Sequence, residues 1–185
     1  MIMRAVVVLF ALAVSGCASS GTKPEAEIVK PTERIVASDN QGMIRTSVAA
    51  NARATIEAPP ARVLAVIESV YTELGIPSAA VDAAAGTITA PRFYKTRKLG
   101  TTNLSMYFNC GDSLNGNIAD NYRMYMTVVT VVRSDGKGGS NLETAVTGEA
   151  ADMGGASSGR IPCGTTGRLE GRIATGVSEK LGAAR

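Results

Sequence analysis

The sequence predicts an α+β fold in which an antiparallel sheet carries two amphipathic helices packed on one face. Apolar side chains recur at helical spacing in two stretches, residues 60–74 and 167–181. Between them, several shorter stretches alternate with a period of two and are separated by turn residues. Strands that follow one another through hairpins, rather than alternating with helices, favour an antiparallel sheet with the helices kept to one side.

The first predicted strand lies within residues 47–57, where apolar and polar residues alternate loosely. Pro59 and Pro60 end it and suit the start of a helix. The helix of residues 60–74 is predicted from one apolar stripe made of Val63, Val66, Ile67, Val70 and Leu74. Gly75 follows as its stop signal.

The central strands are predicted from turn signals and alternation. Residues 79–84 and 87–92 flank an Ala-Gly pair and predict a hairpin. The strongest strand signal covers residues 118–132, where one parity holds Tyr122, Met124, Met126, Val128, Thr130 and Val132. Asp135 and Gly136 turn the chain, and residues 141–149 return as the partner strand.

The second helix is predicted at residues 167–181. Its apolar row repeats every four residues and consists of Leu169, Ile173, Val177 and Leu181. Gly171 and Gly176 interrupt this helix and lower its intrinsic propensity.

The N-terminus has the pattern of an exported protein. Arg4 precedes ten apolar residues, 5–14, and a run of that length cannot cross the roughly 30 Å hydrocarbon core as a helix. It has the length of a signal-peptide core instead. Val14-Ser15-Gly16-Cys17 then resembles the lipobox of bacterial lipoproteins, in which an aliphatic residue and two small residues precede the cysteine that receives the lipid.

This resemblance implies that residues 1–16 are removed and that Cys17 is the lipid attachment point. By analogy with Gram-negative sorting, Ala18 implies the outer membrane, with the protein facing the periplasm. The polar, proline-containing residues 17–43 are expected to be a flexible tether with a reach of roughly 25–30 Å. Residues 44–185 are expected to form a single domain.

Cys110 and Cys163 are the two remaining cysteines, and a disulfide, a metal site and a free nucleophile compete as interpretations. Exported proteins usually pair their cysteines, and lipidation of Cys17 leaves an even number. A zinc site needs about four Cys or His ligands, and a catalytic cysteine normally works with a His base, but the chain contains no His. The sequence therefore predicts a Cys110–Cys163 disulfide, with no metal and no cofactor.

The sequence supplies no catalytic constellation. Residues 155–159 match the letters of G-x-S-x-G, but a nucleophile elbow needs a strand–turn–helix context and a His. Paired carboxylates would have to come from Asp112, Asp120, Glu149, Asp152 or Glu170, and sequence alone cannot bring any two of them together. We therefore expect no catalytic residues and no enzymatic activity.

One basic patch stands out, made of Arg92, Lys95, Arg97 and Lys98, with Phe93 and Tyr94 between them. It is a candidate contact for an anionic surface of the envelope, and the alternative is a solvated strand or loop. Nucleic acid is excluded as a partner, because the predicted compartment does not hold it and the net charge is only +3.

The order of the predicted elements, together with the lipobox, is similar to that of the BamC-like helix-grip lipoproteins. With a lipobox and no catalytic constellation, the chain is expected to be a non-enzymatic interaction or assembly module of the envelope. It would be anchored to the membrane through Cys17 and would contact an envelope protein or an anionic envelope polymer. Two alternatives stay open. One is a carrier that binds a lipid or small ligand between helix and sheet, and the other is a carboxylate-based hydrolase.

Overall fold

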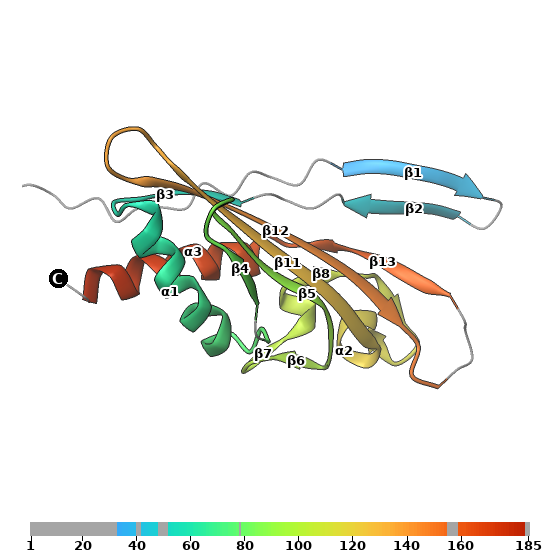
Figure 1. The fold of residues 1–185 in the computed structure, drawn as a ribbon. Helices are drawn as coiled ribbons and strands as arrows, with labels where there is room; N and C mark the ends of the chain where they lie inside the picture. Colours follow the sequence, from blue (N-terminus) through green and yellow to red (C-terminus); the bar gives the residue numbers. More distant parts are fainter. Residues whose placement is uncertain (1–32, 40–41, 48–51, 78, 155–158, 184–185) are drawn as a thin grey trace, which may run out of the picture.

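The computed structural model describes residues 33–39, 42–47, 52–77, 79–154 and 159–183, and it has the predicted α+β fold. Its main sheet has seven strands, all paired antiparallel, in the order β4-β5-β11-β12-β13-β8, with β3 beside β12 (Figure 1). Their bounds are β3 Ala52–Ile56, β4 Ala80–Asp82, β5 Thr87–Thr96, β8 Phe108–Asn109, β11 Arg123–Ser134, β12 Ser140–Ala151 and β13 Arg160–Thr165.

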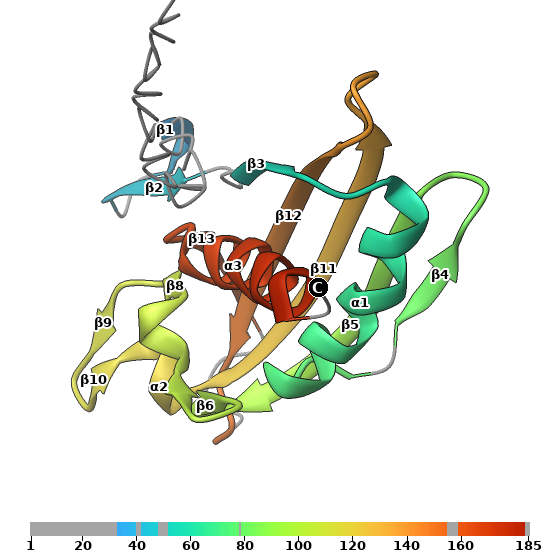
Figure 2. The same cartoon turned by 90° about the vertical axis from the view of Figure 1, so that its left-hand side faces the viewer.

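The helices α1 (Pro60–Glu73) and α3 (Arg168–Ala183) both lie on one face of this sheet, as predicted (Figure 2). Four residues of the predicted stripe of α1 are buried, namely Val63, Ile67, Val70 and Leu74, and Val66 is partly buried. Gly75 follows the helix with a φ of +77°. In α3 the predicted apolar row is buried as well. A Cβ atom on Gly176 would lie 3.0 Å from Cγ1 of Val70, so the glycine that weakens α3 allows α1 to approach it closely.

The long hairpin of β11 and β12 forms the centre of the sheet, and its alternation is confirmed. The side chains of Met124, Met126, Val128, Thr130 and Val132 are at most 3% exposed. The core below is mainly aliphatic, and hydroxyl groups within it pair with one another. The Tyr71 hydroxyl lies 2.8 Å from Oγ1 of Thr130, which lies 2.9 Å from Oγ1 of Thr144.

Two parts of the sheet differ from the prediction. β11 begins at Arg123, because residues Ile118–Asn121 form the short helix α2, whose first turn is capped by the Asn117 side chain. β13 is absent from the sequence prediction, since Pro162 and the glycines around it hide its short alternation. The segment between β5 and β11 also contains β6 Lys98–Leu99, β7 Thr102–Asn103, the 3₁₀ turn η1 Leu104–Met106, β9 Asp112–Ser113 and β10 Gly116–Asn117.

A separate hairpin precedes the main sheet. It consists of β1 (Glu33–Asp39) and β2 (Gly42–Ser47). These strands fall on both sides of residue 43, where the sequence predicts the tether to end. Their residues are mostly polar, so apolar periodicity does not reveal them. The predicted signal peptide, Cys17 and residues 155–158 lie outside the described residues.

Candidate functional site: an arginine–tyrosine cluster on the open sheet face

The candidate site lies on the sheet face opposite α1 and α3, which we call the open face. Side chains that alternate with the core residues of β11 and β12 point to this face and are partly exposed. At one end of the open face six side chains form what we call the arginine–tyrosine cluster: Arg92, Tyr94, Arg123, Tyr125, Glu149 and Arg160.

A β-bulge in β5 brings the first two members to the open face. Ala90 pairs with Val128 and Phe93 pairs with Met126, so two residues of β5 lie opposite the single residue between Met126 and Val128 on β11. The extra residue resets the alternation, because Ala90 and Phe93 would otherwise point to opposite faces. Arg92 consequently lies on the open face, and so does Tyr94, two residues later. Proline, which cannot donate to a ladder, occupies position 91 and is well tolerated at such a bulge.

The strand register places the other members beside these two. Tyr94, Tyr125 and Glu149 are successive cross-strand neighbours on β5, β11 and β12. Arg123 and Arg160 are each paired with Ala151, from β11 and β13 respectively. Residues directly opposite in an antiparallel sheet share a face, so all six side chains project to the same side.

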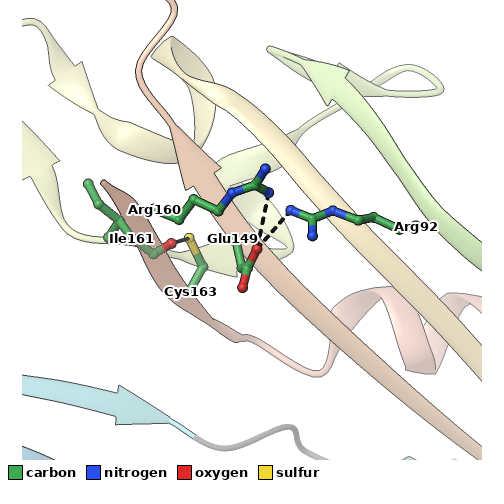
Figure 3. Close-up of polar contacts among 5 residues, drawn as sticks. All are labelled: Arg92, Glu149, Arg160, Ile161 and Cys163. Atoms are coloured by element: carbon green, nitrogen blue, oxygen red, sulfur yellow. Dashed lines mark hydrogen bonds and ion pairs between the residues drawn. The ribbon is translucent and has the colours of Figure 1, made fainter. Parts of the chain in front are cut away.

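Glu149 lies between two guanidinium groups (Figure 3). Nη2 of Arg92 is 2.9 Å from Oε2 of Glu149, and Nη1 of Arg160 is 3.3 Å from the same oxygen. Both guanidiniums also lie over the ring of Tyr125, at 4.7 Å and 4.5 Å from its centroid. The two arginines therefore converge from β5 and β13 onto one carboxylate and one ring.

The second ring extends the cluster toward the edge of the sheet. Tyr94 lies 5.9 Å from Tyr125, tilted by 52°, and the Arg123 guanidinium is 5.1 Å from the Tyr94 centroid. The pKa of Arg123 is raised, chiefly by its hydrogen bond to the side chain of Tyr125. Three arginines and one glutamate give the cluster two net positive charges. Tyr94 is 58% exposed, so both charge and aromatic surface are accessible.

The predicted basic patch does not form a single surface. Arg92 belongs to the arginine–tyrosine cluster, whereas Lys95 pairs with the core-facing Met124 and so starts from the other side of β5. Arg97, which has a φ of +64°, and Lys98 line an open, polar hollow together with Thr96, Asn103, Asp120 and Asn121. The bulge and the turn after β5 separate residues that are adjacent in the sequence.

Sequence reasoning missed three cluster members for different reasons, and it named Glu149 only as a possible catalytic carboxylate. Arg123 and Tyr125 lie on the second parity of the predicted strand, so the same alternation that identified the core could have identified them. The position of Glu149 on the open face could have been identified in the same way from the alternation of β12. Arg160 had no signal, because β13 was not predicted.

The predicted cysteine pair is confirmed in its geometry. The Sγ atoms of Cys110 and Cys163 are 2.04 Å apart, and the Cα atoms are 4.4 Å apart. The sulfur of Met124 lies 3.7 Å from one Sγ and 3.9 Å from the other, and the Ile161 carbonyl oxygen lies 3.5 Å from Cys163 Sγ. Cys163 and Arg160 lie on opposite faces of β13 (Figure 3). The disulfide therefore holds β13 in place on the core side, while Arg160 projects from the same strand to the open face.

The carboxylates named from the sequence have separate local contacts. Asp120 accepts hydrogen bonds from the Ser105 amide at 2.8 Å and from its hydroxyl at 2.6 Å. Asp152 accepts one from the Gly154 amide, and Asp112 lies at an exposed position in β9. Within the described ranges, His, Cys, Asp and Glu side chains form no group of three or more that could hold a metal ion.

Glu170, in the first turn of α3, is a fully buried carboxyl group. Its Oε1 accepts a hydrogen bond from the Thr165 hydroxyl at 2.6 Å, and its Oε2 has no partner among the described residues. Burial raises the pKa of Glu170, although the Thr165 hydrogen bond partly opposes this. The folded state therefore retains a proton at a pH at which the unfolded chain has lost it.

This pKa shift predicts a specific pH dependence of stability. The stabilising contribution is present below the unfolded value of about 4.3 and is lost as the pH rises through the higher folded pKa. Glu170→Gln should remove this fall in the free energy of unfolding. Urea titrations of both proteins from acid to neutral pH measure the difference. The exposed Glu179→Gln, on the same helix, should leave the fall in place, and an unchanged fall in Glu170→Gln would refute the assignment.

Within the part of the chain that the structure describes, no helix is long and apolar enough to cross a membrane. Comparisons of the chain with protein-family models, with curated proteins and with solved structures found no match.

Proposed function

We propose that this chain is a lipid-anchored protein of the cell envelope that acts as a non-enzymatic interaction module through its open sheet face. The observation that carries the proposal is the arginine–tyrosine cluster, which exposes Tyr94 beside the Arg123 guanidinium. The neighbouring Tyr125 carries the guanidiniums of Arg92 and Arg160. Tyrosine and arginine are enriched among the residues that contribute most to binding at protein interfaces. The lipobox-like residues 14–17 support the anchor, since the small residues and the cysteine have the order that lipid attachment requires.

The anchor is tested at Cys17. Cys17→Ser should abolish labelling by a fatty-acid probe and should move the protein from the membrane fraction to the soluble fraction. Ser20→Ala, a similarly small change three residues away, should still label and sediment with membranes. A Cys17→Ser protein that labels and sediments normally would refute the lipid anchor.

The interaction role is tested by photo-crosslinking in cells. A photoreactive residue at Thr147, exposed on β12 between the cluster and the rest of the open face, should give a discrete adduct in the envelope fraction. The control carries the photoreactive residue at position 62, in place of the exposed Arg62 of α1, and samples the opposite side of the sheet. Adducts identical at both positions, or none at Thr147, would contradict binding through the open face.

A further inference from the structure

The arginine pair of the cluster is already engaged by an internal acid. Arg92 and Arg160 come from strands on either side of the β11–β12 hairpin, yet both bond the same Oε2 atom of Glu149. Tyr125 lies under both guanidiniums and holds them in place. A guanidinium has five N–H donors in a planar fork that matches a carboxylate, so each arginine can contact another acidic group beyond its bond to Glu149.

The bonds to Glu149 are also weak enough to exchange. The side chains of Arg92, Arg160 and Glu149 are 50%, 45% and 46% exposed. Ion pairs this exposed contribute little, because water and salt screen them. A partner that excludes water from the same groups strengthens their electrostatic attraction to an incoming carboxylate.

We propose that Arg92 and Arg160 form a carboxylate clamp, held by Glu149 in the free protein, that binds an acidic residue on the surface of a protein partner. The clamp rests on the proposed interaction function and names the chemistry of the partner. The two net positive charges of the cluster are complementary to an acidic surface and attract it. Tyr94, with Arg123 stacked on it, supplies the adjoining aromatic anchor.

The surface next to the clamp favours a protein over a lipid headgroup. The cluster spans β5 to β13, about 14 Å at the usual spacing of strands. Beyond it the open face continues along β11 and β12 with uncharged side chains, namely Thr127, Val129, Ala145 and Thr147. An uncharged area beside a charged and aromatic one is the composition of a protein interface, in which charged residues are depleted from the centre.

The test measures binding of a fluorescein-labelled peptide of alternating Glu and Thr to the full chain in a neutral detergent, by fluorescence anisotropy. Glu149→Gln should increase the affinity about two- to fivefold, because it removes the internal competitor. Arg92→Gln combined with Arg160→Gln should weaken binding at least about tenfold. Misfolding would lower the affinity for the peptide, so it cannot explain the increase expected for Glu149→Gln. This variant therefore distinguishes loss of the clamp from loss of the fold.

Matched controls lie on the same sheet face. Glu143 and Arg53 form an ion pair of 3.5 Å away from the cluster. Glu143→Gln changes the net charge equally but should leave the affinity within about twofold of the original chain, and so should Arg53→Gln. A peptide in which Gln replaces Glu should bind at least about tenfold more weakly to the original chain.

Three outcomes would overturn the clamp. They are no binding of the acidic peptide, a Glu149→Gln affinity no higher than that of Glu143→Gln, and arginine-dependent binding to phosphatidylglycerol vesicles without peptide binding. The last outcome would assign the arginines to the membrane surface. If the Thr147 adduct still forms in any of these cases, the interaction function stands and only the clamp fails. If the adduct is absent while the peptide results hold, the interaction function fails separately.

Discussion

Replacing Cys163 by Ser is expected to lower the free energy of unfolding by about 4 kcal/mol. The disulfide to Cys110 closes a loop with a sequence separation of 53 residues, and the loop contains both long strands of the sheet. Without the bond the unfolded chain gains the entropy of the open loop. Chemical denaturation of the oxidised protein and of the variant measures the loss.

Three comparisons separate the bond from the side chains. Cys110→Ser and the double variant should each lose about the same amount as Cys163→Ser, because the bond is lost once. A reductant should destabilise the original protein by a similar amount and leave the variants unchanged. If the reductant has no effect on the original protein, the bond does not form and the predicted loss is wrong.

Gly75→Ala is expected to lower the free energy of unfolding by about 3 kcal/mol, for two separate physical reasons. Gly75 has a φ of +77°, and a left-handed conformation costs a residue with a Cβ about 1–2 kcal/mol. The new Cβ would also lie 2.7 Å from the backbone nitrogen of Gly100, which cannot rotate away as a side chain could. The end of α1 and the turn between β6 and β7 must then move apart, with a further cost of about 1–2 kcal/mol.

Gly136→Ala is the matched control for this substitution. Gly136 has a φ of +76°, and a Cβ placed there would meet nothing within 4 Å. Gly136→Ala should lower the free energy of unfolding only by the conformational cost, about 1–2 kcal/mol. The difference between the two variants then measures the cost of the backbone contact at Gly100. Equal losses in the two variants would show that the contact at Gly100 is not tight in solution.

The helices and the central hairpin are predictable because their signals are local. The apolar stripe of α1 and the alternation of β11 each lie within one short stretch, so spacing alone identifies the buried side. β13 is different, because its pairing with β12 depends on a partner distant in the sequence and its own residues include Pro162. α2 was hidden because Ile118 continues the parity of the following strand.

The candidate site was only partly predictable for the same reason. Arg92 and Tyr94 belong to a basic run in the sequence, but the structure divides that run and places these two residues in the arginine–tyrosine cluster. What assembles the cluster is the lateral pairing of four strands, which brings Arg160 to Glu149 from the far side of β12. The disulfide partner was predictable without geometry, since only two cysteines remained to be paired.

The bulge at positions 91 and 92 changes which residues of β5 face the core. Before it, even-numbered residues such as Ile88 and Ala90 face the core, and after it the odd-numbered Phe93 does. A single inserted or deleted residue at this point would exchange the faces of every later side chain of β5, exposing Phe93 and turning Tyr94 inward. The hairpin of β4 with the first part of β5 would keep its pairing, because it precedes the bulge. The chemistry of the open face at this edge thus depends on the length of the strand as well as on its composition.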